Sequence, residues 1–228
     1  MNGKLVLVTG ANGGLGTSVT QAFLDAGATV VGTSRKIQQS SFSSPGFTAI
    51  PAEISTREGA SVLIDQVVAR FGRLDVLAHT VGGFAGGSSI AETDDTTFRQ
   101  MLDINLTSAF LVLRAALPAL RKSSGRIIAI GSRAAQDPGP GVGAYSASKA
   151  ALVSLIRTVA AENKDAGVTA NVILPGTIDT PANRKAMPNA DVTRWVQPRS
   201  IADLMVWLAG DSGGDVNGAV IPVYGKDA

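Results

Sequence analysis

The sequence predicts an α/β protein with one doubly wound parallel β-sheet of about seven strands and helices on both faces. Short apolar runs alternate along the chain with longer amphipathic stretches, and no second block of strands or helices follows. The 228 residues are 45% hydrophobic and 17% charged, which fits strands buried on both faces and excludes disorder. A single domain of residues 1–228 is expected, since a chain of this length can bury a sizeable core.

The amino-terminal half contains strand-length apolar runs that are expected to form the first strands of the sheet. They cover residues 4–8, 28–33 and 74–79, with a further strand ending just before Glu53. A helix is expected over residues 15–26, where the apolar residues recur at helical spacing.

The carboxyl-terminal half continues the same alternation of helices and strands. Right-handed crossovers between parallel strands place every carboxyl end along one edge of the sheet, and ligands bind at that edge. Two loops rich in Gly, Pro, Ser or Gln, 38–46 and 137–143, are expected at this edge. The expected helices are 96–120, a segment after Tyr145 and 200–208, and the expected strands are 126–130, 168–174 and 219–223.

Composition excludes several classes of function. The net charge is +2 and no basic block occurs, so no nucleic-acid partner is expected. The absence of cysteine rules out disulfides and thiol nucleophiles, and the single histidine, His79, rules out an HExxH metal site, so no metal is expected. No segment is expected to reach membrane-spanning length and the amino terminus lacks a signal-peptide core, so a soluble cytoplasmic protein without a membrane partner is expected.

The run TGANGGLG follows the first strand directly and precedes a helix. Glycine allows tight turns and a close approach of backbone to a pyrophosphate, and a helix N-terminus attracts phosphate. A plain strand-to-helix turn is the alternative, but the strand before and the helix after it favour a Rossmann-type dinucleotide site. The expected contacts are Thr9, Gly10, Asn12, Gly14, Leu15 and Gly16.

The end of the second strand indicates which dinucleotide binds. NAD sites usually carry an acidic residue there, whereas this chain has Ser34 and Arg35. A guanidinium can bind a 2′-phosphate in a fork and a hydroxyl can donate to it. NADP(H) is therefore predicted over NAD(H), with solvated surface cations as the alternative.

The run YSASK places Tyr145 and Lys149 four residues apart, on one face of a helix. A free tyrosine has a pKa of about 10, and one ammonium about 4 Å away is enough in principle to supply the roughly 4 kcal/mol that brings this pKa close to neutrality. Tyr145 is thus a candidate acid and base. An ordinary surface pair is the alternative.

Together these motifs resemble the short-chain dehydrogenase/reductase family over nearly the whole chain: TGxxxGxG, Asn105 in DINL, Ser132 after the fifth strand, YxxxK, and PGxxxT from Pro175. The resemblance implies that Tyr145 transfers a proton and Ser132 binds the substrate oxygen. It also implies that Lys149 lowers the pKa of Tyr145 and holds the nicotinamide ribose, while Asn105 supports a water linked to Lys149. A helix-kinking amide and a strand-ending serine are the alternatives for Asn105 and Ser132.

The resemblance assigns further cofactor contacts and divides the domain. Residues 1–130 would mainly bind the cofactor, and residues 131–228 would carry the catalytic and substrate-binding part. The usual NNAG after the fourth strand is replaced by HTVG. The additional contacts implied are Glu53 and Ile54 near adenine, His79, Val81 and Gly82 after the fourth strand, and Pro175, Gly176, Ile178 and Thr180 near the nicotinamide and a phosphate.

Two stretches, VGGFAGG and DTPANRKAMPNAD, resemble dihydropteridine reductases within that family. Ser132 and the Ser34–Arg35 pair depart from that pattern, because those enzymes lack the serine and have an NADH-type acidic residue. The segment 181–198 is expected to form a lid over the substrate. The candidate substrate contacts are Phe84, Arg133, Arg184, Met187 and Trp195.

The resulting prediction is an NADP(H)-dependent oxidoreductase that transfers hydride between nicotinamide and a small carbonyl or hydroxyl substrate, with Tyr145 as proton donor. Quinonoid dihydropteridine reduction of a pterin-like substrate is the alternative, and a non-catalytic dinucleotide sensor is less favoured. The resemblance also implies a homodimer or homotetramer through the helices 97–120 and 144–161.

Overall fold

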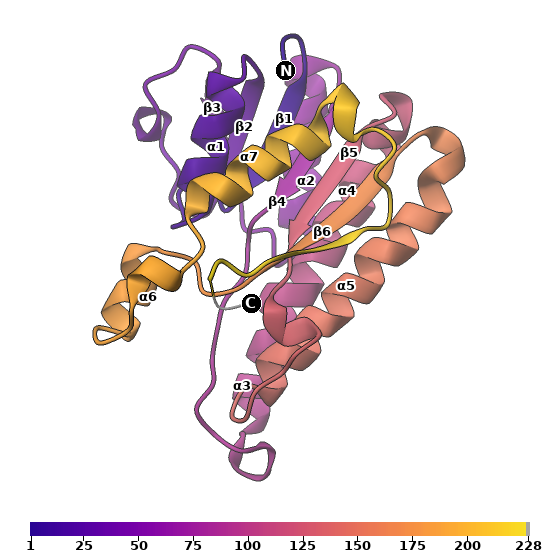
Figure 1. Cartoon of the computed structure of the whole chain (residues 1–228). Helices are drawn as coiled ribbons and strands as arrows, with labels where there is room; N and C mark the ends of the chain where they lie inside the picture. Colours follow the sequence, from indigo (N-terminus) through magenta and orange to yellow (C-terminus); the bar gives the residue numbers. More distant parts are fainter. Residues whose placement is uncertain (227–228) are drawn as a thin grey trace.

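Among the residues that the structure describes, seven strands form one parallel sheet in the order β3-β2-β1-β4-β5-β6-β7 (Figure 1). The structure is a computed structural model, and it describes residues 1–226. It confirms the predicted doubly wound α/β fold in a single domain. The strands are β1 (Leu5–Thr9), β2 (Thr29–Thr33), β3 (Phe47–Ala49), β4 (Val76–His79), β5 (Arg126–Ile130), β6 (Thr169–Pro175) and β7 (Val220–Val223).

The strand order reverses between β1 and β4. The chain runs outward from β1 to β3, returns to β4 on the other side of β1, and then runs outward to β7. Thr9, the last residue of β1, is paired with Thr33 of β2 and with His79 of β4. A crevice opens at such a reversal, outside the carboxyl ends of the strands, so a ligand site is expected there.

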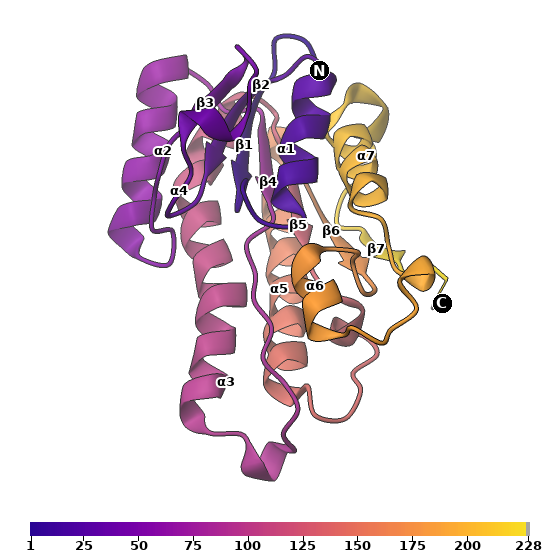
Figure 2. The ribbon, with the colours of Figure 1, turned by 90° about the vertical axis from the view of Figure 1, so that its left-hand side faces the viewer.

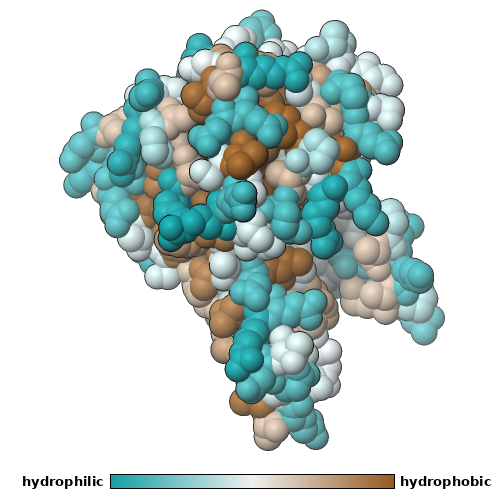
Figure 3. Space-filling view, turned by 180° about the vertical axis from the view of Figure 1, so that it is seen from behind, coloured by the Kyte–Doolittle hydropathy of each residue, from teal (hydrophilic) through white to brown (hydrophobic). Residues whose placement is uncertain are grey.

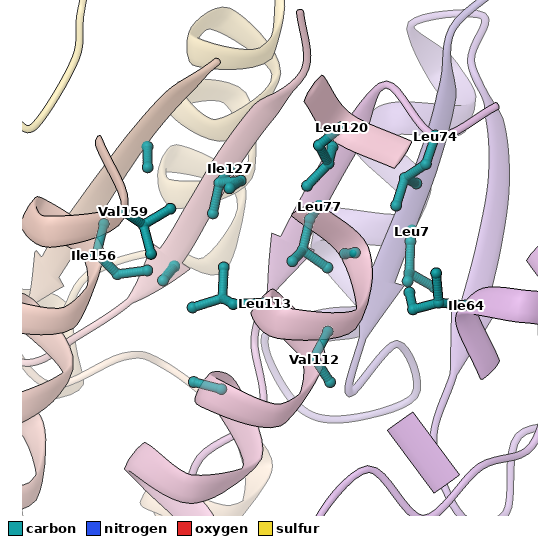
Figure 4. Packing of buried hydrophobic residues seen from close by; sticks show 14 of the residues in the cluster. Leu7, Ile64, Leu74, Leu77, Val112, Leu113, Leu120, Ile127, Ile156 and Val159 are labelled. Carbon is teal, nitrogen blue, oxygen red and sulfur yellow. The ribbon is translucent and has the colours of Figure 1, made fainter. Parts of the chain in front are cut away.

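Helices cover both faces of the sheet (Figure 2). One face packs against α2 (Arg57–Phe71), α4 (Ser108–Lys122) and α5 (Gly143–Asn163), and the other against α1 (Gly16–Asp25) and α7 (Pro198–Ala209). Successive strand residues point to opposite faces. Leu7 and Leu77 therefore pack under α2, α4 and α5 (Figure 4), whereas Val8 and Ala78 pack under α1 and α7.

The connection from β2 to β3 contains no α-helix that covers the sheet. It contains only a 3-10 turn, Gln39–Ser41, in the loop that the sequence predicted to be non-helical. The Gln39 side-chain amide donates to Phe47 O at 2.8 Å and accepts from Ala49 N at 3.0 Å. One glutamine side chain thus satisfies backbone groups of the edge strand β3, which would otherwise be open to pairing.

One continuous helical stretch, Asp95–Lys122, is longer than the sequence analysis allowed for. It consists of α3 (Asp95–Leu102), a π-helical turn (Asp103–Thr107) and α4. By length and composition its 28 residues could cross a membrane, so the expectation that no segment reaches that length is wrong. Val112 and Leu113 of this stretch are buried in the core, so packing against the sheet accounts for the apolar residues on that side of the helix.

On the face opposite to that of Figure 1, the surface is mostly hydrophilic, with apolar side chains exposed in small groups (Figure 3). Those on the helices of the α2, α4 and α5 face include Val62 and Val68 of α2, Phe98 of α3 and Phe110 of α4. A short helix, α6 (Pro181–Ala186), stands apart from the sheet in the segment predicted to be a lid (Figures 1 and 2).

Replacement of Leu77 by alanine tests the core described above. Leu77 is 0% exposed, so the variant should lose about 2 to 5 kcal/mol of unfolding free energy through lost burial and a residual cavity. Denaturant titration followed by circular dichroism measures this. The control is Val62→Ala on the exposed side of α2, and a loss for Leu77→Ala no larger than for the control would contradict the packing.

Candidate active site

A cleft of about 1470 Å³ runs along the carboxyl edge of the sheet. Its walls come from the loops after β1 to β6, from α3 and α6, and from the first turns of α5. Pockets for single drug-sized ligands have about 300 to 1,000 Å³, so this cleft has room for two ligands side by side. The size fits a nucleotide cofactor together with a small substrate.

The loop after β1 forms a bare backbone cradle at the start of α1. Gly10 has φ +71°, and its N–H donates to Thr33 O at 2.8 Å while its carbonyl accepts from Gly13 N at 2.9 Å. A Cβ at Gly16 would collide with Gly10 O, and one at Gly14 would come within 3.0 Å of the Thr180 side chain. Glycine is required at Gly16 and favoured at Gly10 and Gly14, so the backbone is bare here and the start of α1 can receive a phosphate group.

The end of β2 offers polar groups to the same cleft. The Ser34 hydroxyl is buried and has no hydrogen-bond partner within residues 1–226, although Ser34 lines the cleft. Arg35 is exposed, and its Nε lies 3.9 Å from an oxygen of Glu53. Hydrogen bonds from Ser55, together with the charge of Arg35, hold the pKa of Glu53 below its usual value. An unpartnered hydroxyl beside a glycine cradle fits a dinucleotide, whose phosphate and sugar oxygens can accept a hydrogen bond from it.

Ser132, Tyr145 and Lys149 meet at the centre of the cleft. Ser132 follows β5, whereas Tyr145 and Lys149 lie in the first two turns of α5, and all three line the cleft. The Ser132 and Tyr145 hydroxyls share a hydrogen bond. The Lys149 ammonium is 4% exposed and donates to Ile130 O at 2.9 Å.

The predicted electrostatic effect of Lys149 on Tyr145 is not borne out. Burial raises the pKa of Tyr145 above 10.0, and the bond to Ser132 only partly offsets this rise. Desolvation also lowers the pKa of Lys149 from 10.5 to about 8. The sequence argument placed both groups on one helix face and counted only their mutual attraction, whereas burial opposes charge on each group.

Asn105 connects the loop after β4 to the helix that carries Tyr145. It is fully buried on the π-helical turn, and its amide binds both backbone groups of Gly83 at 3.0 Å. Its nitrogen also donates to the Ser148 hydroxyl at 3.0 Å, which in turn donates to Tyr145 O at 2.7 Å. Asn105 therefore lies where the helix is distorted and also holds the loop after β4 and α5 in place.

Most of the predicted cofactor residues line the cleft, but three do not. Thr9 and His79 are buried beneath it, where the Thr9 hydroxyl and His79 Nδ1 are 2.9 Å apart. Desolvation and the charge of Lys149 lower the pKa of His79 to about 3, so the imidazole is neutral. Asn12 is exposed and does not contribute to the wall. The predicted residues on the wall are Gly10, Gly14, Leu15, Gly16, Ser34, Arg35, Glu53, Ile54, Val81, Gly82, Pro175, Gly176, Ile178 and Thr180.

The predicted substrate residues also divide into two groups. Phe84, Arg133 and Met187 line the cleft, whereas Arg184 and Trp195 do not. Arg184 forms a two-bond ion pair with Asp179 at 2.5 and 2.8 Å, and Trp195 is buried. Both residues therefore belong to the packing of the segment after β6, and neither forms part of the cleft wall as the sequence analysis expected.

One part of the wall was missed in the sequence. Thr96, Arg99, Gln100 and Asp103 all line the cleft from α3 and the turn after it. Their spacing of three and four residues puts them on one helix face. That polar stripe was visible in the sequence, but the helix was read only for its apolar face.

Comparison with known proteins agrees with this geometry. Residues 4–191 match the model of the short chain dehydrogenase family. The chain is 31% identical to L-fucose dehydrogenase of Mus musculus, over 92% of this chain and 84% of that protein. It is 32% identical to the rhamnolipids biosynthesis 3-oxoacyl-[acyl-carrier-protein] reductase of Pseudomonas aeruginosa, over 98% and 95% of the two chains.

Solved structures give the same result. The Pseudomonas aeruginosa RhlG/NADP active-site complex superposes with a TM-score of 0.91 at 30% identity, covering 99% of this chain and 96% of that one. The structure of ElxO with NADP bound has a TM-score of 0.91 at 26% identity, covering 99% and 98%. The chain belongs to the short-chain dehydrogenase family, whose members are nicotinamide-dependent oxidoreductases.

The burial of Lys149 predicts a pH-dependent stability. Below pH 8 the folded protein carries the full cost of burying the ammonium, because the pKa falls from 10.5 to about 8 on folding. The cost is lost as pH rises from 8 to 10.5. The free energy of unfolding of the wild type should therefore increase by on the order of 3 kcal/mol relative to that of Lys149→Met across this window. Denaturant titrations at several pH values measure the difference. Lys164→Met changes an exposed lysine and is the control; a difference that stays constant with pH would contradict the burial of Lys149.

Proposed function

We propose that this protein is an NADP(H)-dependent oxidoreductase of a carbonyl or hydroxyl substrate, with Tyr145 as the proton donor. The observation that carries the proposal is the hydrogen-bonded pair of Ser132 and Tyr145, beside Lys149, in the cleft that also contains the glycine cradle. A non-catalytic dinucleotide sensor would have no need for an acid at this place.

The side chains have distinct roles in this mechanism. When bound, the nicotinamide supplies or accepts the hydride. Ser132 donates a hydrogen bond to the substrate oxygen and Tyr145 gives it a proton, so that negative charge does not build up there. The raised pKa of Tyr145 keeps the phenol protonated at neutral pH, which suits reduction. Lys149 holds the ribose of the cofactor, and Asn105 fixes the loop and helix around it.

The preference for NADP(H) is supported by the residues after β2. A phosphate on the ribose would meet the unpartnered Ser34 hydroxyl and the exposed Arg35 guanidinium. The Glu53 carboxylate lies 3.9 Å from the Arg35 guanidinium and compensates its charge. This exposed ion pair is weak, so Arg35 can exchange the carboxylate for a phosphate group. Two similar structures carry NADP in their names, which agrees with this preference.

Replacement of Tyr145 by phenylalanine should remove the proton donor and leave cofactor binding unchanged. We expect kcat to fall by about 10² to 10⁴ with a carbonyl substrate, while the Kd for NADPH, measured by fluorescence titration, stays the same. The control is Tyr224→Phe, which changes the other tyrosine, outside the cleft wall. Full turnover by Tyr145→Phe would show that Tyr145 is not the proton donor. A wild type that binds NADPH but turns over no substrate in a broad screen would favour the non-catalytic sensor.

Replacement of Arg35 by alanine tests the cofactor preference. The loss of a charge-assisted hydrogen bond should raise the KM for NADPH about tenfold or more and leave the KM for NADH nearly unchanged. Lys36→Ala, at the next exposed cation, is the matched control. Equal Michaelis constants for NADPH and NADH in the wild type would overturn the preference.

Quinonoid dihydropteridine reduction is the second candidate. It is favoured by Phe84 in the VGGFAGG loop, which lines the cleft beside Tyr145, and by the lid segment that resembles the pterin enzymes. A spectrophotometric assay with quinonoid dihydropterin and each cofactor separates the two candidates.

We also propose assembly as a homodimer or homotetramer. Phe98 and Phe110 are 43% and 44% exposed on the long helical stretch of α3 and α4, and such side chains favour burial against a second copy. Arg114 covers one of these rings, that of Phe110, at 5.2 Å.

A further inference from the structure

Phe84 is a large apolar side chain at an unusual place. Its side chain lines the cleft, yet 66% of the residue surface is exposed. Exposed aromatic side chains inside a binding cleft are typically covered when a ligand binds. The ring therefore offers free apolar surface to whatever occupies this part of the cleft.

The ring of Phe84 lies directly against the proposed proton donor. Its centroid is 5.0 Å from that of Tyr145, and the two ring planes meet at 75°. This is a favourable edge-to-face arrangement. The two rings thus form two walls of one corner, and a flat group stacked parallel to Phe84 would lie beside the Tyr145 ring.

The backbone that carries Phe84 is held on both sides. Asn105 binds both backbone groups of the preceding Gly83, and Gly87 N donates to Gly141 O at 2.8 Å. A Cβ at Gly86 would come within 2.9 Å of the Phe84 ring, so the ring rests on bare backbone. The loop is fixed before a ligand arrives, so the ring can serve as a rigid wall.

The rest of this corner is apolar or adaptable. Val142 at the start of α5 and Met187 after α6 line the same cleft, and Met187 is 39% exposed. A methionine can adapt its shape to a ring placed against it. Polar groups near the reacting centre are supplied by Ser132 and Tyr145.

We propose that Phe84 determines substrate specificity, and that it selects carbonyl compounds in which the reacting group is attached to a flat, unsaturated ring. This inference rests on the proposed function, because it assigns the substrate class of that same site. A ring that only shielded Tyr145 would act equally on every substrate, so the two roles are distinguishable.

Two diketones that differ in the attached group test the proposal: 1-phenyl-1,2-propanedione, which carries a ring, and 2,3-hexanedione, which does not. With NADPH, Phe84→Leu should lower kcat/KM for the phenyl compound about tenfold and that for hexanedione by less than about twofold. Phe84→Trp keeps an aromatic ring at this position and should therefore keep the preference for the phenyl compound. Phe98→Leu, an exposed phenylalanine of α3 outside the cleft wall, should change neither ratio.

A binding measurement removes the dependence on turnover. With NADP⁺ present, which cannot reduce a ketone, calorimetric titration should show about tenfold weaker binding of the phenyl compound to Phe84→Leu than to wild type. Equal losses for both diketones, or no loss of binding, would overturn the specificity role. A wild type that binds the phenyl compound in a Phe84-dependent way, but turns over neither diketone nor any other compound of a broad carbonyl screen, would contradict the proposed function and leave this inference standing.

Discussion

The cleft depends on the parallel pairing of β1 with β4. This pairing reverses the strand order. It places the turn between β1 and α1 beside the end of β4, which in turn lies next to the end of β5. The glycine cradle after β1 and Ser132 after β5 then lie on one edge of the sheet. Beneath them, the hydrogen-bonded Thr9 and His79 join the two strands at the reversal. Polar groups at this point act as structural support for the floor of the cleft.

Burial, more than charge pairing, sets the chemistry at the centre. Lys149 is buried in the cleft wall, where its ammonium donates to a backbone carbonyl, and its pKa falls to about 8. Tyr145 is held protonated by the same desolvation. Such a site costs stability in the free protein, as functional sites commonly do. Asn105 fixes the glycine-rich loop after β4, because its amide binds Gly83 of this loop on one side and Ser148 of α5 on the other.

Much of the fold could be predicted because the local patterns agree with the final packing. The strand 126–130 matches β5 to the residue, and the other predicted strands and helices differ from the structure by a few residues at their ends. Helix α2 was not singled out, because its apolar periodicity is weak, although its cap residues were readable. Thr56 accepts from Gly59 N at the start, and Gly72 ends the helix with φ +74°. Caps therefore carried information that periodicity did not.

The sequence by itself determined the element order, the glycine cradle, the residues after β2, and the spacing of Tyr145 and Lys149, because each follows from short-range geometry. Only the tertiary structure decided that Arg184 pairs with Asp179, that Trp195 is buried, and that Thr9 and His79 lie below the cleft. It also decided the direction of the Tyr145 pKa. Solvent exposure is the sum of contacts from elements far apart in the chain, so no local pattern could fix it.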